Sequence, residues 1–165
     1  MDVMKNLGFS FDYQWEPFEV EGKHLSFYEH KTTRLNQNKC SHWGAAIYKW
    51  EGMLDDGPNS GRKGILIGET DNLRQRIKQY ISGTQPNGNA YWRKNFLERG
   101  EIYLYILNME RVVFESYEEL VYQKDMNPND FSSGNRRVIY EQLLILREVE
   151  LRDKDDEIWV VNRKL

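Results

Sequence analysis

The chain contains a single cysteine, Cys40, among its 165 residues, so no disulfide can form within it. Proteins that keep their thiols reduced are typical of the cell interior. No segment approaches the roughly 18 consecutive apolar residues that a membrane-spanning helix needs. The N-terminus also lacks the cationic start and apolar run of a secretory signal. These absences predict a cytoplasmic protein that has no membrane partner.

Several common kinds of functional site are missing as well. The three histidines, His24, His30 and His42, are not spaced with Cys40 as zinc ligands usually are. The glycine-containing segment 55–64 (DDGPNSGRKG) lacks the Walker pattern that cradles nucleotide phosphates. No Gly-x-Ser-x-Gly elbow of a serine hydrolase occurs. The sequence therefore predicts none of these three chemistries.

Positive charge is concentrated in one part of an acidic chain. The formal net charge is −3, yet segment 61–99 carries an excess of lysine and arginine over aspartate and glutamate. An acidic protein with one basic segment can still hold a polyanion locally. The alternative is that these charges lie on ordinary solvated helix faces. The basic residues of the segment are Arg62, Lys63, Arg74, Arg76, Lys78, Arg93, Lys94 and Arg99.

Three short apolar runs predict the strands of a small sheet. The first covers 44–51, the second 65–69 and the third 101–109, and all three are rich in residues that favour strands. The first two are linked by the loop 55–64, which predicts an antiparallel hairpin. Alternation along the first strand places Tyr48 on one face together with Ala46 and Trp50.

Helices are predicted after the second and third strands. Leu73, Ile77 and Ile81 form an i, i+4, i+8 stripe that begins after the capping candidates at 70–72 and stops at Gly83. Further helices are predicted at 90–99, 115–123 and 136–152, and further strands at 25–30 and 157–161. The set predicts an α+β domain: a small antiparallel or mixed three-stranded sheet flanked by helices. Residues 1–40 are an N-terminal extension of the same domain, and residues 41–165 form its main body.

Two tripeptides and three later positions form a recognisable pattern. The first strand carries Ala46-Ile47-Tyr48 and the second Leu66-Ile67-Gly68. Asn72-Leu73-x-x-Arg76 follows, with Tyr80 four residues later, and Glu141 precedes an apolar patch in the late helix. This pattern resembles the GIY-YIG nuclease family, and the layout is closest to its compact type II restriction endonucleases. The resemblance covers residues 44–83 and, less closely, 136–146.

The resemblance implies a role for each matched residue. Glu141 would hold a Mg²⁺ ion, for which Mn²⁺ could substitute. Arg76 would stabilise charge on the phosphate, while Tyr48 would position or deprotonate the attacking water with Tyr80 beside it. Leu66 departs from the pattern, because the family has a tyrosine hydroxyl there. Lys63 is a candidate auxiliary group for that missing hydroxyl, and Asn162 is a candidate for a structural asparagine late in the family's domain.

The same residues also have ordinary structural explanations. Arg76 and Tyr80 share one helix face beside the apolar stripe, where an arginine can simply extend past an aromatic neighbour to water. Glu141 can pair with Arg137 one turn earlier, at the edge of the core. Tyr48 can be a sheet-face tyrosine. The family pattern favours the functional interpretation of all four.

The sequence therefore predicts a metal-dependent endonuclease that hydrolyses phosphodiester bonds of double-stranded DNA, most specifically a type II restriction enzyme. A palindromic target would require a homodimer or sequential nicking. Three alternatives stay open: a catalytically weak or inactive module with the same fold that binds nucleic acid or protein, a repair or homing nuclease, and a small α+β protein of unrelated function. The predicted DNA contacts are Arg62, Lys63, Arg74, Lys78, Arg93 and Lys94.

Overall fold

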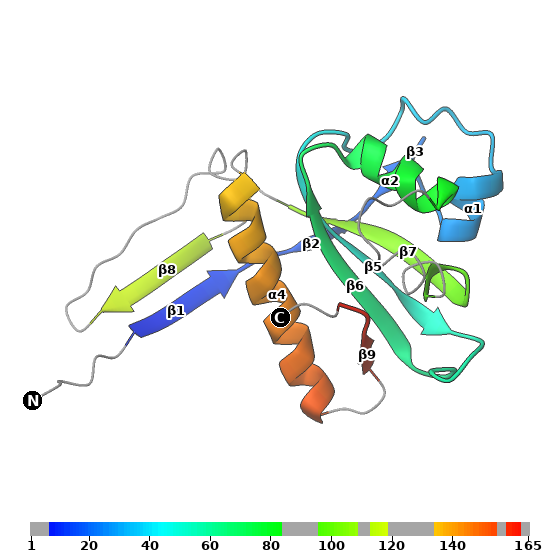
Figure 1. Ribbon diagram of the computed structural model, residues 1–165. Coiled ribbons are helices and arrows are strands. Elements are labelled where there is room, and N and C mark those ends of the chain that lie inside the picture. The colour runs from blue at the N-terminus through cyan, green and yellow to red at the C-terminus, as the bar shows by residue number, and fades with distance from the viewer. Residues whose placement is uncertain (1–6, 84–95, 109–112, 119–133, 155–157, 163–165) are drawn as a thin grey trace, which may run out of the picture.

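The computed structural model describes residues 7–83, 96–108, 113–118, 134–154 and 158–162 (Figure 1). Helices are interspersed among groups of strands along the chain, which confirms the predicted α+β fold class. The elements are β1 (Leu7–Asp12), β2 (Trp15–Pro17), β3 (Glu19–Val20), β4 (Lys23–His24), α1 (Phe27–Thr32), β5 (Ala46–Leu54), β6 (Lys63–Thr70), α2 (Leu73–Ser82), β7 (Gly100–Leu107), β8 (Val113–Glu118), α4 (Gly134–Lys154) and β9 (Ile158–Val160).

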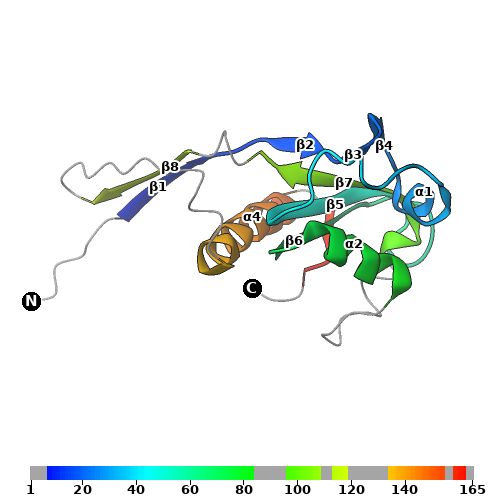
Figure 2. The same ribbon diagram turned by 90° about the horizontal axis from the view of Figure 1, so that it is seen from above.

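The main sheet has the strand order β2-β7-β5-β6-β9. The three predicted strands, β5, β6 and β7, form its centre, and both pairings of β5 are antiparallel. The sheet is larger than predicted because β2 adds to β7 and β9 adds in parallel to β6. Two separate ribbons, β3–β4 and β1–β8, complete the strands, and the β1–β8 ribbon projects away from the sheet on the side opposite α1 (Figures 1 and 2).

Helices cover both faces of the main sheet. Because side chains alternate along a strand, Tyr48 and Trp50 point to one face of β5, and Ile47 and Lys49 point to the other. The first face packs against α2 through its buried residues, and the second packs against α4. Each large apolar side chain buried in this way contributes roughly 1.5–3 kcal/mol. The α2 contacts are Leu73, Ile77 and Tyr80, and the α4 contacts are Tyr140, Leu144 and Ile145.

Helix α2 follows the local signals of its sequence. The Asn72 side chain caps its N-terminus by accepting from the backbone N–H of Gln75 at 3.0 Å. Gly83 ends the helix in the left-handed conformation, with φ of 72°, which a residue with a Cβ rarely adopts. Both ends agree with the predicted helix, so the spacing of Arg76 and Tyr80 on one helix face is also established.

Two predicted elements are wrong. Residues 25–30 were predicted as a strand but contribute to helix α1, because Ser26 and Glu29 form a reciprocal capping box. The predicted helix at 115–123 is wrong over its described part, since 113–118 form strand β8 paired with the distant β1. Pairing with a partner strand overrode local helix propensity there. The predicted strand at 157–161 is confirmed as β9, and most of the predicted helix at 90–99 lies outside the described residues.

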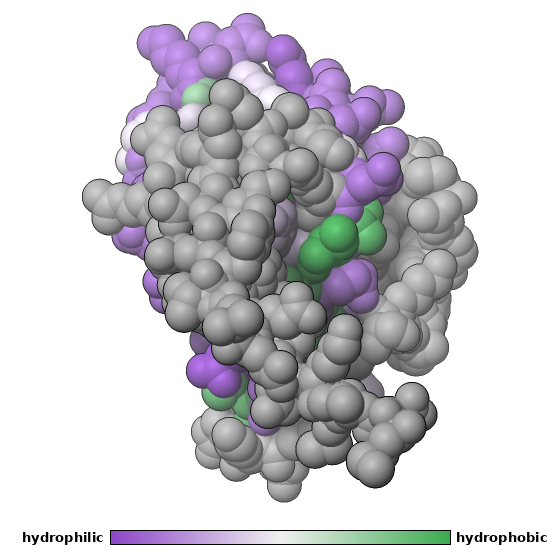
Figure 3. Space-filling view, turned by 90° about the vertical axis from the view of Figure 1, so that its left-hand side faces the viewer, coloured by the Kyte–Doolittle hydropathy of each residue, from purple (hydrophilic) through white to green (hydrophobic). Residues whose placement is uncertain are grey.

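The N-terminal segment shares the core of the main sheet. Strand β2 pairs with β7, and Phe18 and Val20 are completely buried in the cluster that contains α2. Among the described helices, none is long and apolar enough to cross a membrane. Viewed from the left of Figure 1, most of the coloured atoms are hydrophilic, and the apolar ones show chiefly near the middle (Figure 3).

Candidate active site

Two tyrosines from separate elements meet on the α2 face of the sheet. The hydroxyl oxygens of Tyr48 on β5 and Tyr80 on α2 are 2.8 Å apart, and the rings make an edge contact at 6.1 Å between centroids. Tyr48 lies across Gly68 of β6, where an added Cβ would be 2.4 Å from the Tyr48 hydroxyl. Only glycine leaves room for that ring. The Tyr48 ring of the first tripeptide therefore explains why the second tripeptide has glycine at position 68.

Arg76 lies one helical turn before Tyr80 on α2. Its Nε is buried and has no hydrogen-bond partner among the residues that the structure describes. The guanidinium is permanently charged, and an unpaired charged donor away from water is costly. The residue as a whole is only half-buried. Such a group is well placed to bind an anion that approaches this face.

The tyrosine pair itself is shielded from solvent. Tyr48 is 2% exposed and Tyr80 is 5% exposed, and the Trp50 ring makes an edge contact with Tyr80 at 5.9 Å between centroids. A substrate therefore cannot reach the Tyr48 hydroxyl directly in this conformation. Arg76, at the edge of the pair, is the group of the three that solvent reaches most easily. Tyr48 is accordingly better suited to orienting Tyr80 than to touching a reacting atom.

Glu141 lies on α4, which packs on the opposite face of the same sheet. It is half-buried and follows Arg137 by one helical turn. Arg137 is 4% exposed, and its Nε donates to Oε2 of Glu69 at 3.1 Å. The sequence missed this pair, because nothing local signals a partner 68 residues away. Of the four predicted catalytic residues, three share the α2 face and Glu141 lies across the sheet from them.

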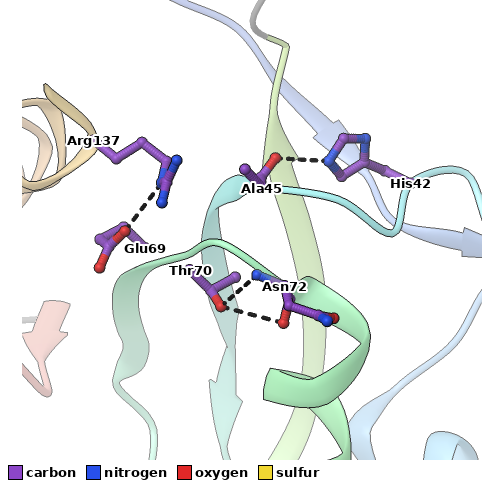
Figure 4. Close-up of polar contacts among 6 residues, drawn as sticks. All are labelled: His42, Ala45, Glu69, Thr70, Asn72 and Arg137. Atoms are coloured by element: carbon purple, nitrogen blue, oxygen red, sulfur yellow. Dashed lines mark hydrogen bonds and ion pairs between the residues drawn. The ribbon is translucent and has the colours of Figure 1, made fainter. Parts of the chain in front are cut away.

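Both helices are anchored at the same end of β6 (Figure 4). On one side of that end, Arg137 of α4 binds Glu69, the penultimate residue of β6. On the other, the Thr70 hydroxyl accepts from the backbone N–H of Asn72, the N-cap of α2, at 3.1 Å. Arg76 lies one turn beyond Asn72, and Glu141 lies one turn beyond Arg137. The two predicted residues thus flank one end of the strand from opposite sides.

The carboxylates permit only a simple metal site. Within the described part of the chain, no group of three or more histidine, cysteine, aspartate or glutamate side chains could hold a metal ion. Mg²⁺ does not need such a cage, because it commonly binds one or two carboxylates and completes its shell with water and substrate phosphate. Glu141 as a single half-buried carboxylate is compatible with that mode of binding and not with a zinc site.

The prediction for Lys63 is corrected by its position. Lys63 begins strand β6 and its Nζ pairs with Oε1 of Glu51 at 3.1 Å. It points to the α4 face, and five residues of strand, about 16 Å, separate it from Gly68 beneath Tyr48. It therefore cannot supply the hydroxyl that Leu66 lacks. Leu66 itself is buried in the core on the α2 face, opposite Trp50 in the strand register.

Asn162 binds the backbone of β6 through both atoms of its side-chain amide. Its Nδ2 donates to the Ile67 carbonyl at 2.7 Å, and its Oδ1 accepts from the Ile67 backbone N–H at 2.9 Å. These two bonds satisfy backbone groups of β6 just beyond the pairing with β9. The segment Leu66-Ile67-Gly68 is thereby held from its outer edge.

Two of the predicted DNA contacts lie on the exposed side of α2. Arg74 and Lys78 are four residues apart and both exposed. The Arg74 guanidinium lies 5.4 Å from the centroid of the Trp43 ring and donates to Oδ1 of Asn38 at 2.9 Å. Arg62 lies in the β5–β6 connection, and Arg93 and Lys94 fall outside the described residues. The sequence did not indicate Trp43 and Asn38 as supports for Arg74.

Comparison with known proteins identifies no relative. No family model matches the sequence, no curated protein matches it, and no solved structure matches the fold. The function is therefore inferred from the residues and their arrangement.

Proposed function

We propose that this protein is a metal-dependent DNA endonuclease that hydrolyses phosphodiester bonds, and that it acts as a sequence-specific type II restriction enzyme. The proposal is carried by one observation: the buried Nε of Arg76, which no described residue pairs with, lies one turn from the hydroxyl pair of Tyr48 and Tyr80. The order β5, β6, α2, β7 is also the order that the GIY-YIG resemblance implies, and strand β8 before α4 departs from it.

In this proposal Arg76 binds the scissile phosphate. Its planar guanidinium forms charge-assisted hydrogen bonds to phosphate oxygens. Because the Nε is already out of water, little solvent has to rearrange around it when charge develops on the phosphate during in-line attack. A fixed donor of this kind is most effective at a site that excludes water.

The tyrosine pair orients the attacking water. In a bond between two hydroxyls one donates, and the accepting hydroxyl keeps its own proton for a further partner. Tyr48 is buried, so it would fix Tyr80 through their shared hydrogen bond, and Tyr80 would hold the water. Unperturbed tyrosine has a pKa near 10, which favours positioning of water over its deprotonation. Tyr80 thus covers the role left vacant by Leu66.

Glu141 would hold the metal ion, with Mg²⁺ or Mn²⁺ as the fitting choices. When bound, such an ion supplies Lewis-acid stabilisation of the phosphate and of the leaving oxygen. The chain's own contribution is to fix Glu141 on α4, which Arg137 ties to the end of β6. A bound DNA phosphate at that end would complete the coordination.

Arg74 and Lys78 are proposed to hold the DNA backbone next to Arg76 on the same helix. Arg74 is already oriented by Trp43 and Asn38, so less side-chain freedom is lost on binding. Each phosphate contact should add to the salt dependence of binding. Cleavage of both strands of a palindrome would need a symmetric dimer or two sequential nicks.

A second candidate is a nucleic-acid-binding module with weak or no catalysis. The burial of Tyr48 and the leucine at position 66 favour it. A repair or homing nuclease is a further alternative with the same chemistry and another target.

Cleavage of supercoiled plasmid in Mg²⁺ or Mn²⁺, with EDTA as the blank, tests the proposal. We expect Arg76→Ala and Glu141→Ala to lose about 10²–10³-fold in rate, the usual cost of removing one charge-stabilising group. Arg34→Ala changes an exposed arginine on the α1–β5 connection and should leave the rate unchanged. Absence of cleavage by the wild type, or equal cleavage by all three variants, would contradict the enzyme and favour the binding module.

A further inference from the structure

A pocket of about 390 Å³ lies at the N-terminal end of β5, where the ends of three strands of the main sheet come together. It is within the size range of small-ligand sites. Its lining combines apolar walls with a few polar groups from three separate segments. The residues that matter are Glu16 of β2, His42 of the loop before β5, Ala46 of β5, and Ile106 and Asn108 at the end of β7.

This pocket adjoins the proposed catalytic residues. Ala46 precedes Tyr48 by two residues on the same face of β5, roughly 7 Å along the strand. Ile106 is the register partner of Tyr48 on β7. One strand of DNA rises 3.4 Å per nucleotide, so about two base steps would join a phosphate near Tyr48 to the pocket. Figure 4 shows His42 just before β5, with its ring turned towards the Ala45 carbonyl.

The polar groups of the pocket chiefly offer acceptors. Asn108 donates from Nδ2 to Oε1 of Glu16 at 2.5 Å, which fixes the carboxylate and leaves its second oxygen able to accept. His42 Nε2 lies 2.8 Å from the Ala45 carbonyl oxygen, which can only accept, so Nε2 carries the hydrogen. In the neutral imidazole, Nδ1 of His42 is then an acceptor.

An acceptor-rich pocket with a carboxylate repels phosphate and attracts hydrogen-bond donors. The donors that DNA presents are the exocyclic amines of its bases, and a carboxylate accepts well from N4 of cytosine. We propose that this pocket receives one amino-bearing base, cytosine or adenine, extruded from the duplex beside the cleavage site. Glu16 accepts from its amine, while Ala46 and Ile106 contact its ring. This assignment rests on the proposed nuclease function and adds a specificity residue to it.

The decisive variant is Glu16→Gln, because glutamine keeps one acceptor for Asn108 and replaces the other oxygen with a donor. Purified wild type and variant would cut a randomised DNA library, and sequencing the ends gives the base preference at each position. We expect wild type to prefer cytosine or adenine at one position within about two steps of the cut. The variant should shift that position towards thymine or guanine, by about 10-fold or more in the preference ratio.

A binding measurement tests the pocket without catalysis. Duplexes with 2-aminopurine directly next to the assigned cytosine or adenine, mixed with protein in Ca²⁺, should gain fluorescence if that base leaves the stack, because the probe then loses a stacking neighbour. His42→Phe keeps a ring but removes the Nδ1 acceptor, and it should weaken the preference at the same position. If Glu16→Gln does not fold, the test is decided by His42→Phe.

Glu101→Gln is the matched control, since it removes the same charge from an exposed position on β7 outside this pocket. A wild type that neither binds nor cuts DNA overturns the nuclease itself. The pocket assignment alone is overturned in three cases: wild type cuts without a base preference, Glu16→Gln keeps the wild-type preference, or Glu101→Gln shifts it equally. Unchanged 2-aminopurine fluorescence also overturns it, because it excludes extrusion.

Discussion

The two faces of the main sheet differ in whether their buried polar groups have partners. On the α4 face, charged side chains compensate one another: Lys49 pairs with Glu51 at 2.7 Å, and Arg137 pairs with Glu69 at 3.1 Å. On the α2 face, buried nitrogens of Arg76, His30 and Trp50 have no partner among the described residues. Paired charges on one face contribute to stability, whereas buried donors without a protein partner are open to a ligand or water. The comparison therefore agrees with the proposal that Arg76 binds an anion on the α2 face.

The charges on the α4 face are closely packed. Lys49 is 8% exposed, and its Nζ lies 4.9 Å from the centroid of the Trp15 ring and 5.3 Å from that of Tyr105. Burial alone would raise the pKa of the Glu51 carboxyl, but hydrogen bonds and charge from Lys49 and Lys63 outweigh it and lower that pKa. Burial raises the pKa of Glu148, which lies in the same cluster. Removing one charged side chain of this cluster should therefore lower the free energy of unfolding, because a buried opposite charge is left unpaired.

Lys49→Met should give the largest loss of stability. It leaves the half-buried Glu51 with only the more exposed Lys63, and breaking a buried pair costs about 3–5 kcal/mol. Urea denaturation gives this free energy of unfolding. Lys63→Met is the control, because its side chain is 43% exposed and the change should cost less than about 1 kcal/mol. Equal losses for both would show that Lys49 is not compensated in the way the contacts suggest.

The α2 face should respond to acid through His30. Burial, with a smaller effect from His24, lowers the pKa of His30 from 6.5 to about 4, while Glu29 opposes that shift. The unfolded chain therefore binds the proton first, and stability should fall as the pH drops from 6.5 to 4. The loss would total about 3 kcal/mol.

Denaturant titrations at pH 6.5, 5.5 and 4.5 measure that slope, and His30→Phe should remove it. Glu51 does not interfere, because its lowered pKa means that its contribution is lost only below the ordinary carboxyl value near 4.5. A slope that is unchanged in His30→Phe would assign the acid sensitivity to other groups.

Local signals explain why part of this arrangement was predictable. The alternation at 46–50 and the capped stripe from Leu73 to Gly83 are properties of neighbouring residues. They predicted that Tyr48 shares a strand face with Trp50 and that Arg76 shares a helix face with Tyr80, but not that the two faces meet. Pairings between distant segments carried no such signal, as with β1 and β8 or Arg137 and Glu69. Helix α1 is a different case, because its capping residues Ser26 and Glu29 are a local signal of a helix start within the predicted strand 25–30.

The smallest expected effect in this comparison concerns the hydrogen bond between Tyr48 and Tyr80. Tyr80→Phe removes one hydroxyl, keeps the ring against Trp50, and leaves the Tyr48 hydroxyl without this partner. We expect a loss of about 1 kcal/mol in unfolding free energy, the usual value of a neutral hydrogen bond. If Tyr80 holds the attacking water, plasmid cleavage should fall further than stability alone explains, at a temperature where the variant is fully folded. Tyr28→Phe, at an exposed tyrosine, should change neither quantity. Cleavage unaffected in Tyr80→Phe would limit the pair to a structural role and leave Arg76 as the sole functional group of this face.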